Sequence, residues 1–409
     1  MTSAVTVADR RRATLERLHG PSAARTAPRR TRRRPADADA APRERAVVGP
    51  PPGTFYAIAA VVAVLVTLGL VMVLSASAVT EANLGRSPYR VFGKQAMWAG
   101  MGLLAMVVVV RIPYHWWQRL AIPLGVVTAA AMFAPFAPGI GASVNGARSW
   151  IYLGPLSVQP SEFLKIAVVI LAASILARRN EDRSPLVWLA VLATVAGGLS
   201  LMQGDLGSAI VLGAIVLSVA WIGGVALTPL GAMAGTAALG ALAFVLSSPR
   251  RLDRFTAFLN VTEEKDHLAY QTYQGYLSMA SGGLGGSGIG GSNGKLGYLP
   301  YAHSDFIFAV IADELGLIGS IAVLGGFIVL VGLGIQVALA APDRFGMLLA
   351  GGVATWFGVQ AIINVGGVTG LMPVTGLTLP FFSAGGTSLF VSMIAVGLLL
   401  SVARRLNAR

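Results

Sequence analysis

The sequence predicts an all-α protein that crosses a membrane about ten times, and three observations support this prediction. Hydrophobic residues make up 55% of the chain and charged residues only 12%, with a mean hydropathy of +0.70. A soluble domain carries about a quarter charged residues, so the composition indicates an integral membrane protein. The apolar residues form long continuous runs rather than alternating strands of about ten residues, which favours helices over a barrel. Basic residues gather between the runs, as in other multi-pass proteins.

The apolar runs are predicted to be membrane-spanning helices. In chain order they are 54–75, 95–111, 118–137, 162–178, 185–202, 206–223, 226–247, 306–340, 345–364 and 386–403. Most have close to the roughly 20 residues that a helix needs to cross the hydrocarbon. The run 306–340 exceeds one bilayer thickness, so we expect it to tilt or to protrude into the cytoplasm.

Short basic connectors determine the predicted orientation. The positive-inside rule places both termini in the cytoplasm, with the connectors 111–119, 177–183 and 343–344 and the end 403–409. The basic cluster 250–254 is the exception, but it belongs to a long loop, 248–305, between the seventh and eighth spans, and long loops escape the rule. The predicted outward segments are 76–94, 138–161, 248–305 and 365–385.

Residues 1–53 form a separate basic tail, with 12 arginines against 5 acidic residues. The tail is rich in Ala, Pro and Arg and has few large apolar residues, so we expect it to be disordered. It is too long for a signal peptide and lacks a cleavage site. A polybasic segment beside a membrane is expected to stay cytoplasmic and to contact anionic lipid rather than nucleic acid. The membrane domain is predicted to cover 54–405, with 406–409 as a cytoplasmic end.

Several kinds of chemistry are excluded by composition. The chain has no cysteine, so a disulfide, a thiol nucleophile and a thiolate metal site are impossible. The four scattered histidines, His19, His115, His267 and His303, cannot form a His-rich metal site.

Asp305 stands at the mouth of the predicted helix 306–340, directly after a glycine-rich stretch. Two interpretations are equally open from its position. Ser304 or Asp305 could cap the helix, or the carboxylate could be catalytic. His303 is expected to orient a neighbour rather than to react. The preceding run 281–294 contains eight glycines, which indicates positive φ angles, close backbone approach or mobility, in a flexible linker or a lid.

A second group of polar residues lies at the outer end of the fourth span. Ser161 is predicted to cap this helix, with Pro160 just before it. Glu162 and Lys165 are three residues apart on one helix face, so we expect an ion pair, either as structural glue or in a polar site. Asp205, in the next outward turn, lies within possible reach of Lys165 or simply forms the turn.

The segment 370–388 is apolar but interrupted by Pro and Gly, so we expect it to be re-entrant and buried in protein or along a cavity. From chemistry alone, two classes remain open. One is a transporter or flippase with charges along its path, and the other is an enzyme that acts at the outer face on a lipid-linked substrate. No internal inverted repeat is visible to favour the transporter.

These motifs together resemble the SEDS family of bacterial cell-wall proteins (shape, elongation, division and sporulation), over nearly all of 54–405. The marks, in order, are Asn145-Gly-Ala-Arg-Ser-Trp-Ile, Gln159-Pro-Ser-Glu-Phe, Asp205-Leu-Gly, Leu299-Pro with Ala302-His-Ser-Asp-Phe-Ile-Phe-Ala, and Pro373-Val-Thr-Gly with Leu379-Pro-Phe. The stretch Val71-Met-Val-Leu-Ser-Ala-Ser-Ala looks like the division branch, FtsW, more than RodA, with the sporulation branch SpoVE close by. The long basic tail is similar to that of FtsW proteins from high-GC Gram-positive bacteria.

The chain departs from the family pattern at three positions. Tyr301 stands where the family usually has Glu, Gly204 where it has Pro, and Ala384 where it has Tyr. The missing acid at Tyr301 argues against a second catalytic carboxylate there.

The resemblance implies a peptidoglycan glycosyltransferase that polymerises lipid II and releases undecaprenyl pyrophosphate. Asp305 would be the general base. The pyrophosphate would be stabilised by Lys165, Arg148 and Arg250 or Arg251, in falling order of expectation, with Glu162 orienting Lys165. The resemblance identifies no definite cofactor, although a divalent cation such as Mg²⁺ could be held by Asp305 or Asp205.

The resemblance also implies partners and a location. The partners would be a class B penicillin-binding transpeptidase of the FtsI type and other divisome proteins, in the plasma membrane at the division septum. A lipid II flippase is the second reading, since it would use the same lipid, and a non-catalytic divisome scaffold is the third.

Overall fold

The computed structural model describes residues 51–144, 147–154, 156–178, 185–264, 269–292 and 299–406. The predicted basic tail therefore lies almost entirely outside the described residues, as does the end 407–409. The helices are α2 (Gly53–Asn83), α3 (Arg90–Arg111), α4 (His115–Ala131), η1 (Ala134–Phe136), α5 (Pro160–Ala177), α6 (Pro185–Met202), α7 (Leu206–Ile222), α8 (Leu227–Leu246), α9 (Pro249–Leu259), α10 (Tyr270–Gly282), α11 (Ile307–Ala340), α12 (Arg344–Val368) and α13 (Gly386–Ala403). The strands are β1 (Gly141–Val144), β2 (Ala147–Leu153) and β3 (Leu156–Val158).

The all-α membrane fold is confirmed. Within the described residues, nine helices are long and apolar enough to cross a membrane, and the apolar α7 is slightly shorter at 17 residues. Each of the ten predicted runs corresponds to one of these helices. The agreement follows from the uninterrupted apolar sequence of each run, because its backbone can satisfy its hydrogen bonds in lipid only as a helix.

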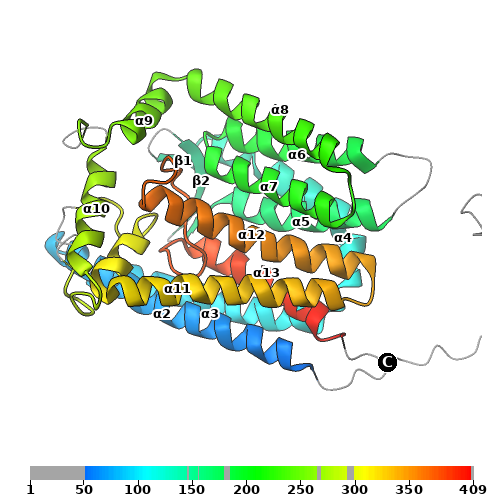
Figure 1. Ribbon diagram of the computed structural model, residues 1–409, viewed down its shortest axis with the longest axis horizontal. Coiled ribbons are helices and arrows are strands. Elements are labelled where there is room, and N and C mark those ends of the chain that lie inside the picture. Colours follow the sequence, from blue (N-terminus) through cyan, green and yellow to red (C-terminus); the bar gives the residue numbers. More distant parts are fainter. Residues whose placement is uncertain are drawn as a thin grey trace, which may run out of the picture. The chain divides into compact units, whose positions relative to one another are not determined.

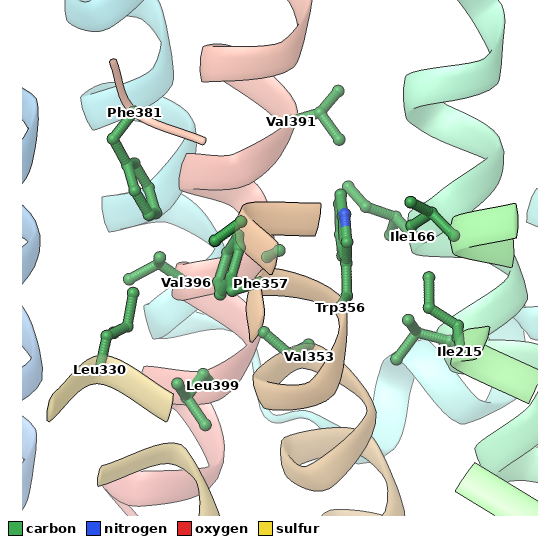
Figure 2. Packing of buried hydrophobic residues seen from close by; sticks show 14 of the residues in the cluster. Ile166, Ile215, Leu330, Val353, Trp356, Phe357, Phe381, Val391, Val396 and Leu399 are labelled. Atoms are coloured by element: carbon green, nitrogen blue, oxygen red, sulfur yellow. The ribbon is translucent and has the colours of Figure 1, made fainter. Parts of the chain in front are cut away.

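Helix α12 occupies the centre of the bundle, where it packs against α5, α7, α11 and α13. Figure 2 shows its large side chains Trp356 and Phe357 within the core, surrounded by residues of the neighbouring helices: Ile166, Ile215, Leu330, Val391, Val396 and Leu399. Helix α8 has the opposite character, because Leu230 is its one buried residue and most of its other apolar side chains are exposed. A helix that is apolar all round and unburied is suited to contact with lipid.

The predicted outward segments meet at one end of the bundle. The strands, α9 and α10 lie together there, while α2 begins and α13 ends at the opposite end (Figure 1). The three strands form an antiparallel sheet in the order β1-β2-β3, with Ile151 opposite Val158. This sheet, in 138–161, and the two helices α9 and α10, in 248–305, were not expected from the sequence.

Helix α11 is interrupted at Gly316, whose φ of 67° and ψ of −166° are not helical. The single tilted or protruding helix expected for 306–340 is therefore wrong, and the extra length is a separate first piece at the outer end. The break is stabilised by the glycine-rich run, since Leu317 N donates to Gly283 O at 3.0 Å and Gly288 N donates to Glu314 O at 3.0 Å. Only glycine fits at this crossing, because a Cβ on Gly316 would overlap the backbone of Gly286.

The buried carboxylate of Asp313 fixes the same run from its other side. Four serine hydroxyls donate to it: Ser278 at 2.9 Å, Ser281 at 2.9 Å, Ser287 at 3.2 Å and Ser292 at 2.6 Å. The positive φ angles and close backbone approach expected for the run are thus present in its described part, 281–292. In this arrangement the described part of the run braces α11, and the lid role stays a prediction.

The re-entrant prediction for 370–388 is correct up to Gly385, after which α13 begins. The segment from 371 to 385 is non-helical, and its side chains Leu379, Phe381 and Phe382 are almost completely buried. Phe381 reaches the core beside α12, where its ring centroid lies 5.2 Å from that of Phe357 (Figure 2). The part of the irregular backbone from Leu379 to Ser383 is therefore enclosed by protein, as the absence of water in a bilayer requires.

Candidate functional site

A cavity of about 600 Å³ opens at the outer end of the bundle. Its walls come from β2, the start of α5, the turn before α7, α9, the start of α10, the turn 301–305 and the re-entrant segment. Four residues predicted for the site line it: Glu162, Asp205, Arg251 and Asp305. Lys165, Arg148 and His303 do not, and the side chain of Arg250 lies outside the described part of the chain.

Asp305 lies one residue before the cap of α11 and does not cap the helix. Phe306 occupies the cap position and no side chain bonds there, so the capping interpretation of Ser304 and Asp305 is wrong. The backbone of Asp305 is held instead by Asn364, whose Nδ2 donates to Asp305 O at 2.9 Å and to Leu377 O at 2.7 Å. A single amide on α12 thus joins the aspartate turn to the re-entrant segment.

The carboxylate of Asp305 is directed toward the re-entrant wall of the cavity. A Cβ on Gly376 would lie 4.0 Å from Asp305 Oδ2, and the φ of 73° at Gly376 disfavours any side chain there. Burial raises the pKa of Asp305 from 3.8 to about 6, against the opposing effects of hydrogen bonds to its own backbone and to Ser304, and of the charge of Arg254. A carboxylate with a pKa of about 6 is ionised at neutral pH yet is a stronger base than an ordinary aspartate.

His303 lies two residues before Asp305 and does not line the cavity. Its backbone oxygen accepts a hydrogen bond from Ala384 N at 2.8 Å, which ties the aspartate turn to the end of the re-entrant segment. Burial lowers the pKa of the His303 imidazole below 6.5, and the nearby charge of Glu81 only partly offsets this. The imidazole is therefore neutral at physiological pH, and the orienting role expected from the sequence stays a prediction.

The predicted ion pair between Glu162 and Lys165 is present, with Lys165 Nζ 2.8 Å from Glu162 Oε1. Both side chains are buried, Lys165 completely. The ammonium also donates to Gln360 Oε1 at 3.1 Å and lies 5.6 Å from the ring centroid of Trp356. Lys165 therefore stands behind Glu162, which alone of the pair lines the cavity and whose Oε2 has no hydrogen-bond partner among the described residues.

Asp205 caps α7 and does not reach Lys165. Its Oδ1 accepts from Ser208 N at 2.8 Å, while Oδ2 accepts from Ser208 Oγ at 2.6 Å and Gln159 Nε2 at 3.1 Å. Ser161 Oγ also approaches Oδ2, at 3.4 Å, because Ser161 lies inside α5 rather than at its cap. The prediction of Ser161 as the cap is wrong: the helix begins at Pro160, with Gln159 at the cap position.

Helix α9 supplies the cations of the cavity. Arg251 lines it, but its Nη1 donates to Phe244 O and to Ser247 Oγ, both at 3.1 Å, and its guanidinium lies 3.6 Å from the ring centroid of Phe244. Arg251 is thus largely engaged with the end of α8. Arg254 lines the same wall, is exposed, and lowers the pKa of Asp305 through its charge.

Arg254 was missed in the sequence analysis, although it belongs to the basic cluster noted there. Its spacing of three residues from Arg251 places both on one face of a helix, which is the signal that could have found it. Arg148 was predicted for the site but does not line the cavity. Its side chain is exposed on β2, and its backbone N donates to Gln203 O at 3.0 Å.

The residues present offer limited ligands for a divalent cation. In the described ranges no group of three acidic or histidine side chains could hold a metal ion. The carboxylate of Asp205 is already surrounded by donors from Ser208, Gln159 and Ser161. The described side chains of the cavity therefore do not by themselves form a complete ligand set for a divalent cation.

Residues 56–408 match the FTSW_RODA_SPOVE family, described as "Cell cycle protein". The chain is 38% identical over 371 residues to a "Probable peptidoglycan glycosyltransferase FtsW" of Mycobacterium tuberculosis, covering 89% of this chain and 71% of the relative. It is 36% identical over 344 residues to stage V sporulation protein E of Bacillus subtilis, covering 83% of this chain and 94% of the relative.

Solved structures give the same result for the fold. A chain described under "Structural coordination of polymerization and crosslinking by a peptidoglycan synthase complex" superposes with a TM-score of 0.71 at 29% identity. The rod shape determining protein RodA of Thermus thermophilus superposes with a TM-score of 0.65, also at 29% identity. In both comparisons the match covers 87% of this chain and 98% of the solved chain.

Proposed function

The chain belongs to the FtsW/RodA/SpoVE family of cell cycle proteins, and from this premise we propose that it is a peptidoglycan glycosyltransferase that polymerises lipid II. The resemblance to the SEDS family stated from the sequence is thereby confirmed. One observation carries the assignment to this cavity: a carboxylate of raised basicity, Asp305, faces a space of about 600 Å³ into which a guanidinium, Arg254, also projects its charge.

Asp305 is the general base in this proposal. The 4-hydroxyl oxygen of the acceptor sugar attacks the anomeric carbon of the donor, and its proton passes to the carboxylate. The bond between that carbon and the pyrophosphate oxygen breaks, and its electron pair leaves with undecaprenyl pyrophosphate. At pH 7 a group with a pKa of about 6 is roughly 90% ionised, so the base is ready for each cycle.

The leaving pyrophosphate requires positive charge, and Arg254 is the side chain best placed to supply it. It is exposed along the cavity, and its planar guanidinium suits bidentate contact with phosphate. Arg251 lies on the same face but serves the end of α8, so we assign it a supporting role. Lys165 acts through Glu162, whose carboxylate it holds at the wall of the cavity.

Helix α9 also forms the boundary between the cavity and the bilayer that holds a lipid-linked substrate. Its apolar residues Leu252, Phe255 and Leu259 are exposed, whereas Arg251, Arg254 and Ala257 face the cavity. An amphipathic helix of this kind lies in the membrane interface with its apolar face in lipid. The wall formed by α9 thus separates the sugar-binding cavity from the bilayer, where the isoprenoid chain remains.

The partners and place of action follow from the family. We propose that the chain works with a class B penicillin-binding transpeptidase of the FtsI type and other divisome proteins at the division septum. The support is the similarity to FtsW proteins and to a chain of a peptidoglycan synthase complex. The chain itself is a multi-pass membrane protein.

The test is polymerisation by purified protein with its transpeptidase partner and lipid II, followed by gel analysis of glycan strands. Asp305→Asn is expected to abolish polymer, because the amide cannot accept the proton. Asp253→Asn is the matched control, since it removes a carboxylate from the same cavity without removing the base. Normal polymerisation by Asp305→Asn would refute the base assignment, and lipid scrambling without polymer under every partner condition would indicate a flippase.

Arg254 is tested in the same assay. Arg254→Ala is expected to lower the rate of polymerisation by about 100-fold or more, the scale seen when one transition-state donor is removed. Arg254→Lys should recover only part of the rate, because an ammonium cannot bind phosphate in the bidentate manner. If Lys165→Met alone reproduced the loss while Arg254→Ala had none, the pyrophosphate would belong to Lys165.

A further inference from the structure

A second cavity lies far from the proposed active site, between α2, α3 and α13. It encloses about 330 Å³ and is lined by Pro51, Phe55 and Ala59 of the first helix region and by Met106, Val107, Val110, Arg111, Leu400 and Arg404. Helix α2 begins here, and α3 and α13 end here, so this groove is at the end of the bundle opposite α9 and α10 (Figure 1). The basic connectors place that end in the cytoplasmic leaflet.

The wall of the groove is apolar, but its rim carries two cations. Arg111 is the last residue of α3 and is exposed, and Arg404 follows directly after α13 and is partly exposed. Neither arginine forms an ion pair or a side-chain hydrogen bond with the part of the chain that the structure describes. Two guanidinium groups beside an apolar channel call for an anion that is attached to a hydrocarbon chain.

We propose that this groove binds an anionic phospholipid of the cytoplasmic leaflet. One acyl chain fills the space between Phe55, Ala59 and Val107, and the phosphate is held by Arg111 and Arg404. An apolar cavity of this kind is not a stable place for water, whereas hydrocarbon fills it without cost. Arginine binds phosphate oxygens bidentately, and the cytoplasmic surface carries the negative lipids that such a site would select.

The chain's own basic tail is the competing occupant, and charge disfavours it. Residues 1–53 carry 12 arginines against 5 acidic residues, so the tail brings the same sign of charge as the rim of the groove. An anionic headgroup is complementary to both the rim and the tail. The site would therefore hold a lipid at the point where the chain enters the bundle, at Pro51.

Lipid retention by the full chain tests the proposal. The purified protein is titrated with phosphatidylglycerol or phosphatidylcholine of identical acyl chains, and bound lipid is counted by native mass spectrometry. Wild type is expected to bind phosphatidylglycerol at least about tenfold more tightly. The double variant Arg111→Gln/Arg404→Gln should lose about 25-fold of that affinity, at about fivefold for each arginine. Arg119→Gln, an exposed arginine on the same side that is not part of the groove, should stay within about twofold.

A photolabel identifies the occupant directly and does not depend on how the double variant folds. The chain has no cysteine, so Ala59→Cys provides a unique position for a benzophenone inside the groove. A phospholipid adduct after irradiation in membranes supports the proposal. A peptide adduct from residues 1–50, or no adduct, would overturn it, as would equal affinity for the two lipids or an unchanged affinity in the double variant.

Discussion

Replacement of Lys165 by methionine tests whether the buried ion pair is structural. The ammonium is completely buried, lies 2.8 Å from Glu162 Oε1 and donates to Gln360 Oε1 at 3.1 Å. Methionine has a similar length and flexibility, so Lys165→Met removes the charge with little change in volume. The carboxylate of Glu162 is then left 2% exposed with neither oxygen paired.

The expected loss of stability in Lys165→Met follows from the charge of Glu162, which is left without a partner. Breaking a buried pair by removing one partner costs about 3–5 kcal/mol, mostly from the charge that stays behind. Replacing both residues, as in Glu162→Gln/Lys165→Met, removes both charges, so we expect it to recover at least about 2 kcal/mol of the loss. The coupling energy of the cycle should therefore exceed the few tenths of a kcal/mol seen for independent sites.

Stability in detergent, measured by thermal or chemical unfolding, provides the assay, and polymerisation of lipid II is measured on the same samples. Lys94→Met is the matched control, since Lys94 is exposed on α3, and its effect should stay within about 0.5 kcal/mol. Equal destabilisation by Lys165→Met and the double variant would refute the reasoning. Loss of polymerisation in Lys165→Met without loss of stability would mean that Lys165 acts on the substrate.

Three further predictions follow from the geometry of the outer end. Because Asp305 must be ionised to accept a proton and its pKa is about 6, the polymerisation rate should be constant above pH 7 and fall about tenfold per pH unit below pH 6; a flat profile down to pH 5 would exclude Asp305 as the base. Gly316→Ala should lower the free energy of unfolding by at least about 2 kcal/mol, since the φ of Gly316 is 67° and an added Cβ would meet backbone. Gly325→Ala is the control in the same unfolding assay. It has open space in the same helix and should be neutral or stabilising by up to about 1 kcal/mol. Asp313→Asn should weaken four serine hydrogen bonds, each worth about 1.5–3 kcal/mol with a charged acceptor. The run 281–292 should then be cleaved faster in limited proteolysis. An unchanged cleavage rate would show that these bonds do not hold the run.

The membrane helices could be predicted because each depends on its own run of apolar residues. The run 185–202 coincides with α6, and 206–223 differs from α7 by one residue. The helix ends were less certain, since they depend on contacts from elsewhere in the chain. Ser161 has the chemistry of a cap, but α5 begins at Pro160 and the Ser161 hydroxyl approaches Asp205 instead.

The candidate site shows the same division between local and distant information. The pairing of Glu162 with Lys165 follows from helical spacing, and it was predicted correctly. The depth of Lys165 depends on Gln360 and Trp356 of α12, nearly 200 residues away, so no local pattern could reveal it. Arg254 is the intermediate case, because its spacing of three residues from Arg251 was readable but the helix α9 and the neighbouring Asp305 were not.

Asn364 connects two parts of the cavity wall through hydrogen bonds. Its single amide group donates to the carbonyls of both Asp305 and Leu377, so the base and the re-entrant wall are attached to one turn of α12. A rotation or a shift of α12 would carry both together and leave their separation unchanged. The opening can then widen or narrow mainly by displacement of α9, which packs on the lipid-facing α8. Such a displacement would also move Arg254 relative to Asp305, so in the proposed mechanism the width of the opening and the distance from the base to this guanidinium would change together.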